Sequence, residues 1–290
     1  MRVTFLLFEG FQPIDLGGPW QAFTTANEEG GRTLYELSTC GPVPVATTIG
    51  QGLRVVLDHT LEGSRDLRPH TVIVPGGEGV HAAAGSMDMR AWLRHQDGMS
   101  QRTCSVCSGA FLLAAAGLVE GHTVTTHWRA ASQLQRDFPG LRVQDERIFC
   151  ESGKYWTTAG VTAGIDLALA LIERDGGTAL AQKVARRLVV HLRRGGDQRH
   201  YSQALRAQDR AGAPFGGLID RIEADIALSW TVDDMADASN MSRRTFQRKF
   251  KQSFGVTPVE LLRTLRAERS ALLTRAGRVS RKERQRAVGA

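Results

Sequence analysis

The segment that most constrains this chain is residues 231–262, which read TVDDMADASNMSRRTFQRKFKQSFGVTPVELL. Thr231 is placed to cap a first helix, and Asp234 stands three residues later, where a carboxylate completes a capping box. Ser242 is a typical cap for a second helix, and Gly255 a typical left-handed stop for it. Two short helices joined by a tight turn, with a third helix behind them, are predicted. This is the layout of a helix-turn-helix, which places one helix in the major groove of DNA.

The second predicted helix has two different faces. Phe246, Phe250 and Phe254 recur every four residues, so they share one face that is expected to point inward. Polar and basic side chains fall on the outer side or its flank: Arg243, Arg244, Gln247, Arg248 and Lys251. Arg can bind guanine and Gln can bind adenine through paired hydrogen bonds. The pattern predicts double-stranded DNA as a partner, the alternative being an ordinary solvated basic face on a small helical bundle.

Charge is unevenly distributed along the chain. Residues 191–290 carry 20 Lys and Arg against 11 Asp and Glu, whereas residues 1–190 carry 17 against 19. The excess positive charge therefore lies in the last third, where a polyanion is expected to dock.

A length of 290 residues favours two domains. No apolar run approaches the length of a membrane span, and the first residues lack the features of a signal peptide, so no membrane association is expected. Four cysteines in a chain of this size do not form a disulfide scaffold, which favours a reducing cytoplasm.

The first 190 residues alternate between two patterns, which predicts a parallel sheet sandwiched by helices. Apolar or β-branched runs predict strands at Arg2–Phe8, Leu34–Ser38, Thr71–Val74, Thr103–Val106 and Thr123–Thr126. Helical patterns cover Asp88–Gln96, Gly109–Ala116, Arg129–Phe138, Gly164–Glu173 and Thr178–Val190.

Two of these predicted strands end in residues suited to chemistry. The predicted strand Thr71–Val74 runs into Gly76 and Gly77, whose backbone N–H groups could closely approach a ligand. The predicted strand Thr103–Val106 runs into Cys107. Gly109, two residues later, permits a sharp turn of the kind that exposes a nucleophile. At a helix N-terminus the Cys107 thiolate is expected to be stabilised. The Cys104-x-x-Cys107 spacing has no second Cys or His pair to complete a metal site, and no metal is predicted.

Three stretches, PIDLGGPWQAF (13–23), VPGGEG (74–79) and CSGAFLLAAAGLVEGHTVTTHW (107–128), resemble the PfpI superfamily. That resemblance implies a flavodoxin-like, class I glutamine amidotransferase-like fold. Together with MSRRTFQRKFKQSFGVTP (241–258), the chain resembles AraC-type transcriptional regulators of the GlxA type. The resemblance implies a sensor or dimerisation domain at 1–190, a linker at 191–213 and a helix-turn-helix domain at 214–276. A basic, disordered tail is expected at 277–290.

AraC-type DNA-binding regions contain two helix-turn-helix units joined by a long helix. Residues 258–275 resemble the joining helix, and no second capped helix pair follows it. The sequence is therefore expected to carry a truncated domain with one unit.

The resemblance also implies a pocket. Cys107 is its elbow cysteine and Asp15 its acid, and the remaining members are Ser108, Gly109, Gly76, Gly77 and His127. Asp15 could shuttle a proton to or from Cys107, with Ser108 assisting. The favoured interpretation is a regulator whose pocket senses an unknown small molecule or serves a homodimer, with no cofactor. The alternatives are a cysteine-dependent hydratase or amidase-like enzyme, similar to isocyanide hydratases, and a pocket with neither role.

Overall fold

The computed structural model of this chain describes residues 1–50, 52–190, 225–254 and 256–263, and the single residues 215, 218, 221, 222, 265 and 266. The chain divides into two compact units, Met1–Arg194 (unit 1) and Gly195–Ala290 (unit 2). Several predicted features lie outside the described residues. These are the linker 191–213, the tail 277–290, the stop at Gly255 and the distal part of the joining helix.

Unit 1 is built on a seven-stranded sheet in the order β10-β11-β7-β6-β1-β2-β5. All neighbouring pairs are parallel except β10 and β11. The bounds of these strands are β1 Arg2–Leu6, β2 Glu36–Gly41, β5 His59–Thr60, β6 Thr71–Val74, β7 Arg102–Val106, β10 Phe149–Ser152 and β11 Tyr155–Thr158. The chain leaves β1 toward β2 on one side and returns to β6 on the other, so the topological switch point lies between β1 and β6, where ligands bind in such folds.

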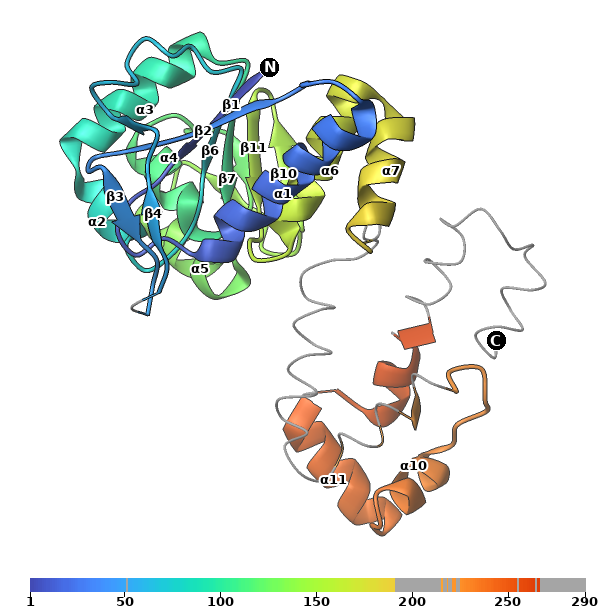
Figure 1. The fold of residues 1–290 in the computed structure, drawn as a ribbon. Coiled ribbons are helices and arrows are strands. Elements are labelled where there is room, and N and C mark those ends of the chain that lie inside the picture. The colour runs from blue at the N-terminus through green and yellow to red at the C-terminus, as the bar shows by residue number, and fades with distance from the viewer. Residues whose placement is uncertain are drawn as a thin grey trace. The chain divides into compact units, whose positions relative to one another are not determined.

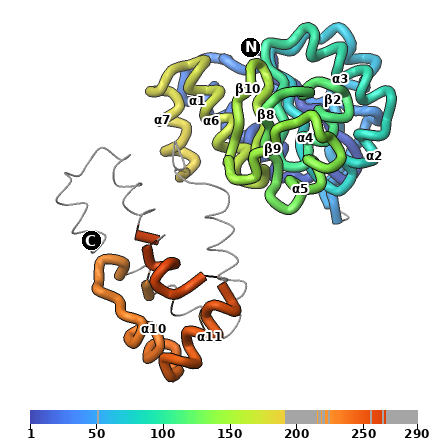
Figure 2. The backbone as a smooth tube through the Cα atoms, turned by 180° about the vertical axis from the view of Figure 1, so that it is seen from behind, coloured from blue at the N-terminus to red at the C-terminus, as the bar shows by residue number. Residues whose placement is uncertain are grey.

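Helices cover both faces of this sheet (Figures 1 and 2). One layer contains α1 Pro13–Gly30, α6 Ala163–Gly176 and α7 Thr178–Arg187. The other contains α2 Val80–Gly85, α3 Met87–Met99 and α4 Ala110–Ala115, which follows the short 3₁₀ turn η1 Cys107–Gly109. β6 and β7 are buried along their whole length, as expected for central parallel strands. The predicted helix-covered parallel sheet is confirmed.

Several parts of unit 1 differ from the predicted elements. The run at Thr123 forms β8 Thr123–Val124, which pairs only with β9 Arg142–Val143 outside the main sheet. α1 was not predicted, because its sequence contains Pro19 and several glycines, which weaken a helical pattern. A small antiparallel ribbon, β3 Val45–Thr47 and β4 Arg54–Val56, was not predicted. The helix predicted at Arg129–Phe138 is present as α5 Trp128–Asp137.

Unit 2 contains the predicted helix pair, α10 Val232–Ala238 and α11 Arg243–Phe254. The capping box is present, since Thr231 Oγ1 accepts from Asp234 N at 3.1 Å and Asp234 Oδ2 accepts from Thr231 N at 2.8 Å. Asn240 lies in the turn with a left-handed φ of 52°. A further helix begins at residue 258.

The core of unit 2 forms around the phenylalanines of α11. Phe246 and Phe250 are fully buried, as predicted. Phe215 packs against them with ring centroids 5.7 Å and 5.5 Å away, in T-shaped geometry. Leu261 and Leu262 are also buried there, so the predicted third helix contributes side chains to the same core. Among the helices within the described ranges, none is long and apolar enough to cross a membrane.

Candidate functional site

Cys107 stands at the carboxyl end of β7, at the start of the turn η1. Its φ of 55° lies in the left-handed region, which costs a residue with a side chain roughly 1–2 kcal/mol. The thiol is half-buried. The predicted sharp turn between strand and helix is therefore present, and its strain is concentrated at the cysteine itself.

Asp15 is fully buried in the first turn of α1, which follows β1. Its Oδ2 accepts from the backbone N–H of Gly76 at 3.0 Å, and its Oδ1 from that of Val161 at 2.9 Å. This carboxylate lies near enough to the thiol of Cys107 for its charge to raise the pKa of the thiol. The sheet thus brings together side chains and backbone from the carboxyl ends of β1, β6, β7 and β11.

Two glycines press against Cys107. A Cβ on Gly76 would lie 2.7 Å from the Cβ of Cys107, and a Cβ on Gly160 would lie 2.2 Å from it. Gly109 is equally confined, because its Cβ would lie 2.3 Å from the carbonyl oxygen of Val74. Only glycine leaves room for the elbow at these positions.

Gly160 and Val161 were missed by the sequence analysis. They follow β11, which was not predicted as a strand. A strand ending in a glycine is the signal that marked Gly76, so recognising β11 would have indicated Gly160 as well.

The N–H groups of Gly76 and Gly77 were predicted to face a ligand. In the structure the first donates to Asp15, and the second donates to Ser108 Oγ at 3.0 Å. These bonds hold the turn after β6 against the turn after β7. A ligand that used either N–H group would have to displace a side chain.

His127 is directed elsewhere. Its Nδ1 accepts from the N–H of Arg129 at 3.4 Å and so caps α5. Burial lowers its pKa, with a smaller contribution from the charge of Arg129. The neighbouring Thr126 is the residue that contacts the elbow, donating to the carbonyl oxygen of Cys107 at 2.7 Å.

The electrostatics of the thiol differ from the prediction. Burial raises the pKa of Cys107 to about 12, and the charge of Asp15 adds to the rise. The hydrogen bonds from Ser108 act in the opposite direction but are outweighed. Burial also raises the pKa of Asp15 to about 6. The expected stabilised thiolate is therefore wrong for this structure, because desolvation exceeds the effect of the helix N-terminus.

Cys104 is fully buried inside β7, as expected for a small core residue. Its pKa is raised to about 12 by burial. Across the described parts of the chain, no cluster of three His, Cys, Asp or Glu side chains is suited to a metal ion.

The second candidate site is the outer face of α11. Its predicted DNA-contacting side chains are all exposed: Arg243, Arg244, Gln247, Arg248 and Lys251. Arg243 differs from the others, because its Nη1 lies 2.9 Å from Oδ2 of Asp233 in the first turn of α10. This ion pair connects the two helices of the motif next to the face that would meet DNA.

The architecture agrees with known proteins. The model of the DJ-1/PfpI family matches residues 1–174. The chain belongs to the DJ-1/PfpI family. A second model, of bacterial regulatory helix-turn-helix proteins of the AraC family, matches residues 222–263 and thus α10 and α11.

Relatives of the DJ-1/PfpI chain include regulators and an enzyme. The HTH-type transcriptional regulator GbdR of Pseudomonas aeruginosa is 26% identical over 272 residues, covering 93% of this chain and 73% of that protein. Isonitrile hydratase of Pseudomonas putida is 32% identical over 184 residues, covering 63% of this chain and 76% of the enzyme. The crystal structure of a ThiJ/PfpI family protein from Pseudomonas syringae is 26% identical, with a TM-score of 0.56, and the match covers 63% of this chain and 72% of that one.

Proposed function

We propose that this chain is a DNA-binding transcriptional regulator. Its helix-turn-helix binds promoter DNA, and its DJ-1/PfpI unit senses a small molecule and forms a homodimer. The observation that carries the proposal is that α11 has two distinct faces: Phe246 and Phe250 are buried on one, and the basic side chains are exposed on the other. A capped helix held by its own core can enter the major groove without losing buried contacts. The four cysteines form no disulfide, which agrees with action in a reducing cytoplasm.

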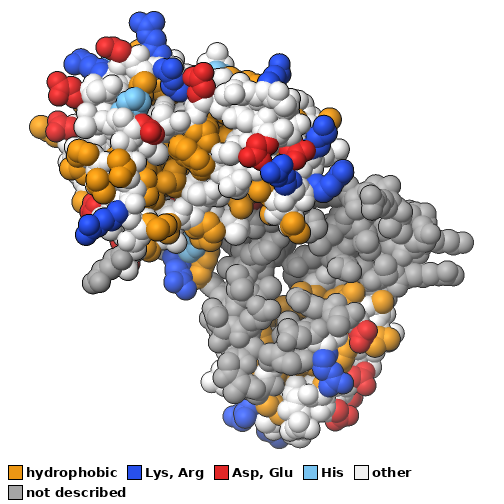
Figure 3. Space-filling model, viewed as in Figure 1, with side chains coloured by type: hydrophobic (Ala, Val, Ile, Leu, Met, Phe, Trp, Pro, Cys, Tyr) orange, Lys and Arg blue, Asp and Glu red, His pale blue; other side chains and the backbone are white. Residues whose placement is uncertain are grey.

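A two-fold symmetric homodimer would place two α11 helices, one from each copy, on one operator. Homodimers of helix-turn-helix proteins bind half-sites roughly 34–36 Å apart. The ribbon of β3 and β4 is a candidate contact, because Val43, Val45, Leu53 and Val56 are exposed there. Hydrophobic side chains gather over this part of unit 1 in the face shown in Figure 3. Sedimentation of Val45→Asp and Val56→Asp variants should show monomers if this ribbon joins the two copies.

DNA binding is tested with duplexes that the wild-type protein selects from a random-sequence pool. The Arg244→Ala, Arg248→Ala double variant should lose at least about 30-fold in affinity, since each paired contact to a base discriminates by roughly 1–3 kcal/mol. The matched control is the Lys249→Ala, Arg263→Ala double variant, which removes the same charge from exposed positions outside the proposed base-reading set. Equal losses in the two variants would contradict base recognition by α11.

A second candidate function, turnover by Cys107, is favoured by one observation. The Asp15 carboxylate lies close enough to the Cys107 thiol to shift the pKa of the thiol, and such proximity is required of a base that activates a nucleophile. The raised pKa of Cys107 weighs against this function, because the thiolate is a minor species near neutral pH. Incubation with a simple isocyanide tests it directly: formamide production that disappears in Cys107→Ser would establish turnover, while the regulatory proposal expects none.

A further inference from the structure

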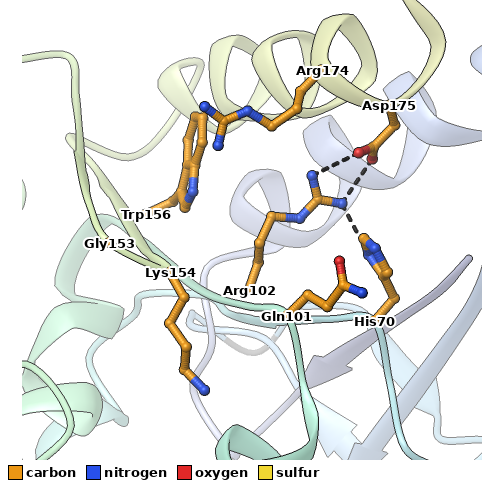
Figure 4. A pocket seen from close by; sticks show the side chains of 8 residues that line it. All are labelled: His70, Gln101, Arg102, Gly153, Lys154, Trp156, Arg174 and Asp175. Carbon is orange, nitrogen blue, oxygen red and sulfur yellow. Dashed lines mark hydrogen bonds and ion pairs between the residues drawn. The ribbon is translucent and has the colours of Figure 1, made fainter.

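A pocket lies at the opposite end of the sheet from Cys107. Its walls come from the amino ends of β7 and β11 and from the end of α6, whereas Cys107 stands at a carboxyl end. Trp156 lines one side of this pocket and Arg102 with Asp175 the other, and Arg174 reaches in from α6 (Figure 4). The proposed roles of the Cys107 site and of α11 use none of these residues.

Trp156 contributes a polar group without a partner. Its side chain is buried, with 3% exposure, and among the described residues its indole N–H has no hydrogen-bond partner. Two other tryptophans show the usual situation, since Trp92 donates to Ser64 Oγ at 2.9 Å and Trp230 to the carbonyl oxygen of Asp225 at 3.1 Å. A buried donor left unpaired is costly. Trp156 lines the pocket, and its buried N–H would gain a partner if a small shift of the ring brought it to an acceptor there.

Arg102 and Asp175 satisfy each other and do not supply that acceptor. Arg102 Nη1 and Nη2 donate to the two carboxylate oxygens of Asp175 at 2.9 Å and 2.7 Å, and both side chains are more than nine-tenths buried. Tyr35 donates to Asp175 as well, at 2.9 Å. This side of the pocket is therefore formed by a buried ion pair with no net charge, whose hydrogen bonds hold both side chains in place.

Arg174 is the pocket cation that lies over the Trp156 ring. Its guanidinium lies 4.9 Å from the centre of the Trp156 ring, and its side chain is half-exposed. One of its nitrogens, Nη1, donates to Glu151 at 2.7 Å. A guanidinium has five N–H donors, and its planar fork fits oxyanions well. An oxyanion beside the indole N–H would therefore meet a positive charge.

We propose that this pocket binds a small oxyanion, a carboxylate or a phosphate group. One ligand oxygen accepts the N–H of Trp156, and the negative charge pairs with the guanidinium of Arg174. The site is separate from the Cys107 site and does not depend on the proposed binding of DNA.

The indole N–H signals of the ¹⁵N-labelled full chain test this proposal. The sequence contains five tryptophans, and the signal missing from the Trp156→Phe spectrum identifies Trp156. The probes are sodium acetate and inorganic phosphate, titrated against sodium chloride at constant ionic strength. The Trp156 signal should move and saturate with at least one oxyanion, while those of Trp92 and Trp230, already bonded, should not move.

Two variants make the test specific. Arg174→Gln should weaken the oxyanion about 10-fold or more. Arg129→Gln is the matched control, because Arg129 also lies 4.9 Å from the centre of a tryptophan ring, that of Trp128, outside this pocket. A response to acetate alone would identify a carboxylate ligand, and one to phosphate alone a phosphate ligand. No response to either, an equal response to chloride, or an unchanged affinity in Arg174→Gln would overturn the proposal.

Discussion

The carboxylate of Asp15, in the first turn of α1, interacts with the thiol of Cys107, in the turn after β7, and raises the pKa of that thiol. Both groups are desolvated, so each has a pKa above its ordinary value. The pair is held by backbone as well, because Asp15 also accepts the N–H groups of Gly76 and Val161.

Asp15 makes the stability of unit 1 depend on pH. Its pKa of about 6 in the folded state exceeds the ordinary value of about 3.9, a difference worth roughly 3 kcal/mol. Since the folded state favours the protonated acid, this contribution is fully present below about pH 4 and is lost as the pH rises through about 6. Urea denaturation at pH 4 to 8 should show that loss in the wild-type protein relative to Asp15→Asn. Parallel pH profiles of the two proteins would contradict it.

Cys107 should react slowly with alkylating agents at neutral pH. Its rate with iodoacetamide, followed by mass spectrometry, is expected to keep rising to at least pH 10, because only the thiolate reacts and the pKa is about 12. In Asp15→Asn the rate at pH 8 should increase severalfold, since the neighbouring negative charge is gone. The buried Cys40 serves as an internal control that stays unmodified. A plateau near pH 7 would instead reveal a stabilised thiolate.

Gly160→Ala should destabilise the elbow strongly. The new Cβ would lie 2.2 Å from the Cβ of Cys107 and 2.6 Å from its Cα, so backbone would have to move. The control is Gly117→Ala, where φ is also positive, at 75°, but no atom lies within 4 Å of the added Cβ. The control should lose about 1–2 kcal/mol for the left-handed conformation, and Gly160→Ala about 1–3 kcal/mol more for overpacking. Equal losses in thermal denaturation would show that the contact is relieved without cost.

Asp175→Ala should cost roughly 3–5 kcal/mol in the free energy of unfolding, because it leaves the buried Arg102 guanidinium without its partner. Glu151→Ala is the comparison. It breaks the exposed pair with Arg174 and should cost less than about 1 kcal/mol. Chemical denaturation of both variants measures the difference, and similar values would mean that water reaches Arg102 readily.

Much of the site was predictable because its signals are local. The strands that end at Gly76 and Cys107 are continuous apolar runs, and parallel strands must present their carboxyl ends at one edge. The role of Asp15 came from resemblance, since α1 has little helical periodicity. Gly160 could not be paired with Cys107, because that contact depends on β11 lying beside β7.

The amino-acid sequence by itself determined the helix-turn-helix and the helix-covered sheet. Caps, the four-residue spacing of Phe246 and Phe250, and alternating apolar runs act over a few residues and can be read along the chain. Only the tertiary structure decided the protonation of Cys107 and left the N–H of Trp156 without a partner within the described part of the chain. Both depend on how far water is excluded by segments distant in the chain, and desolvation is a property of the packed fold.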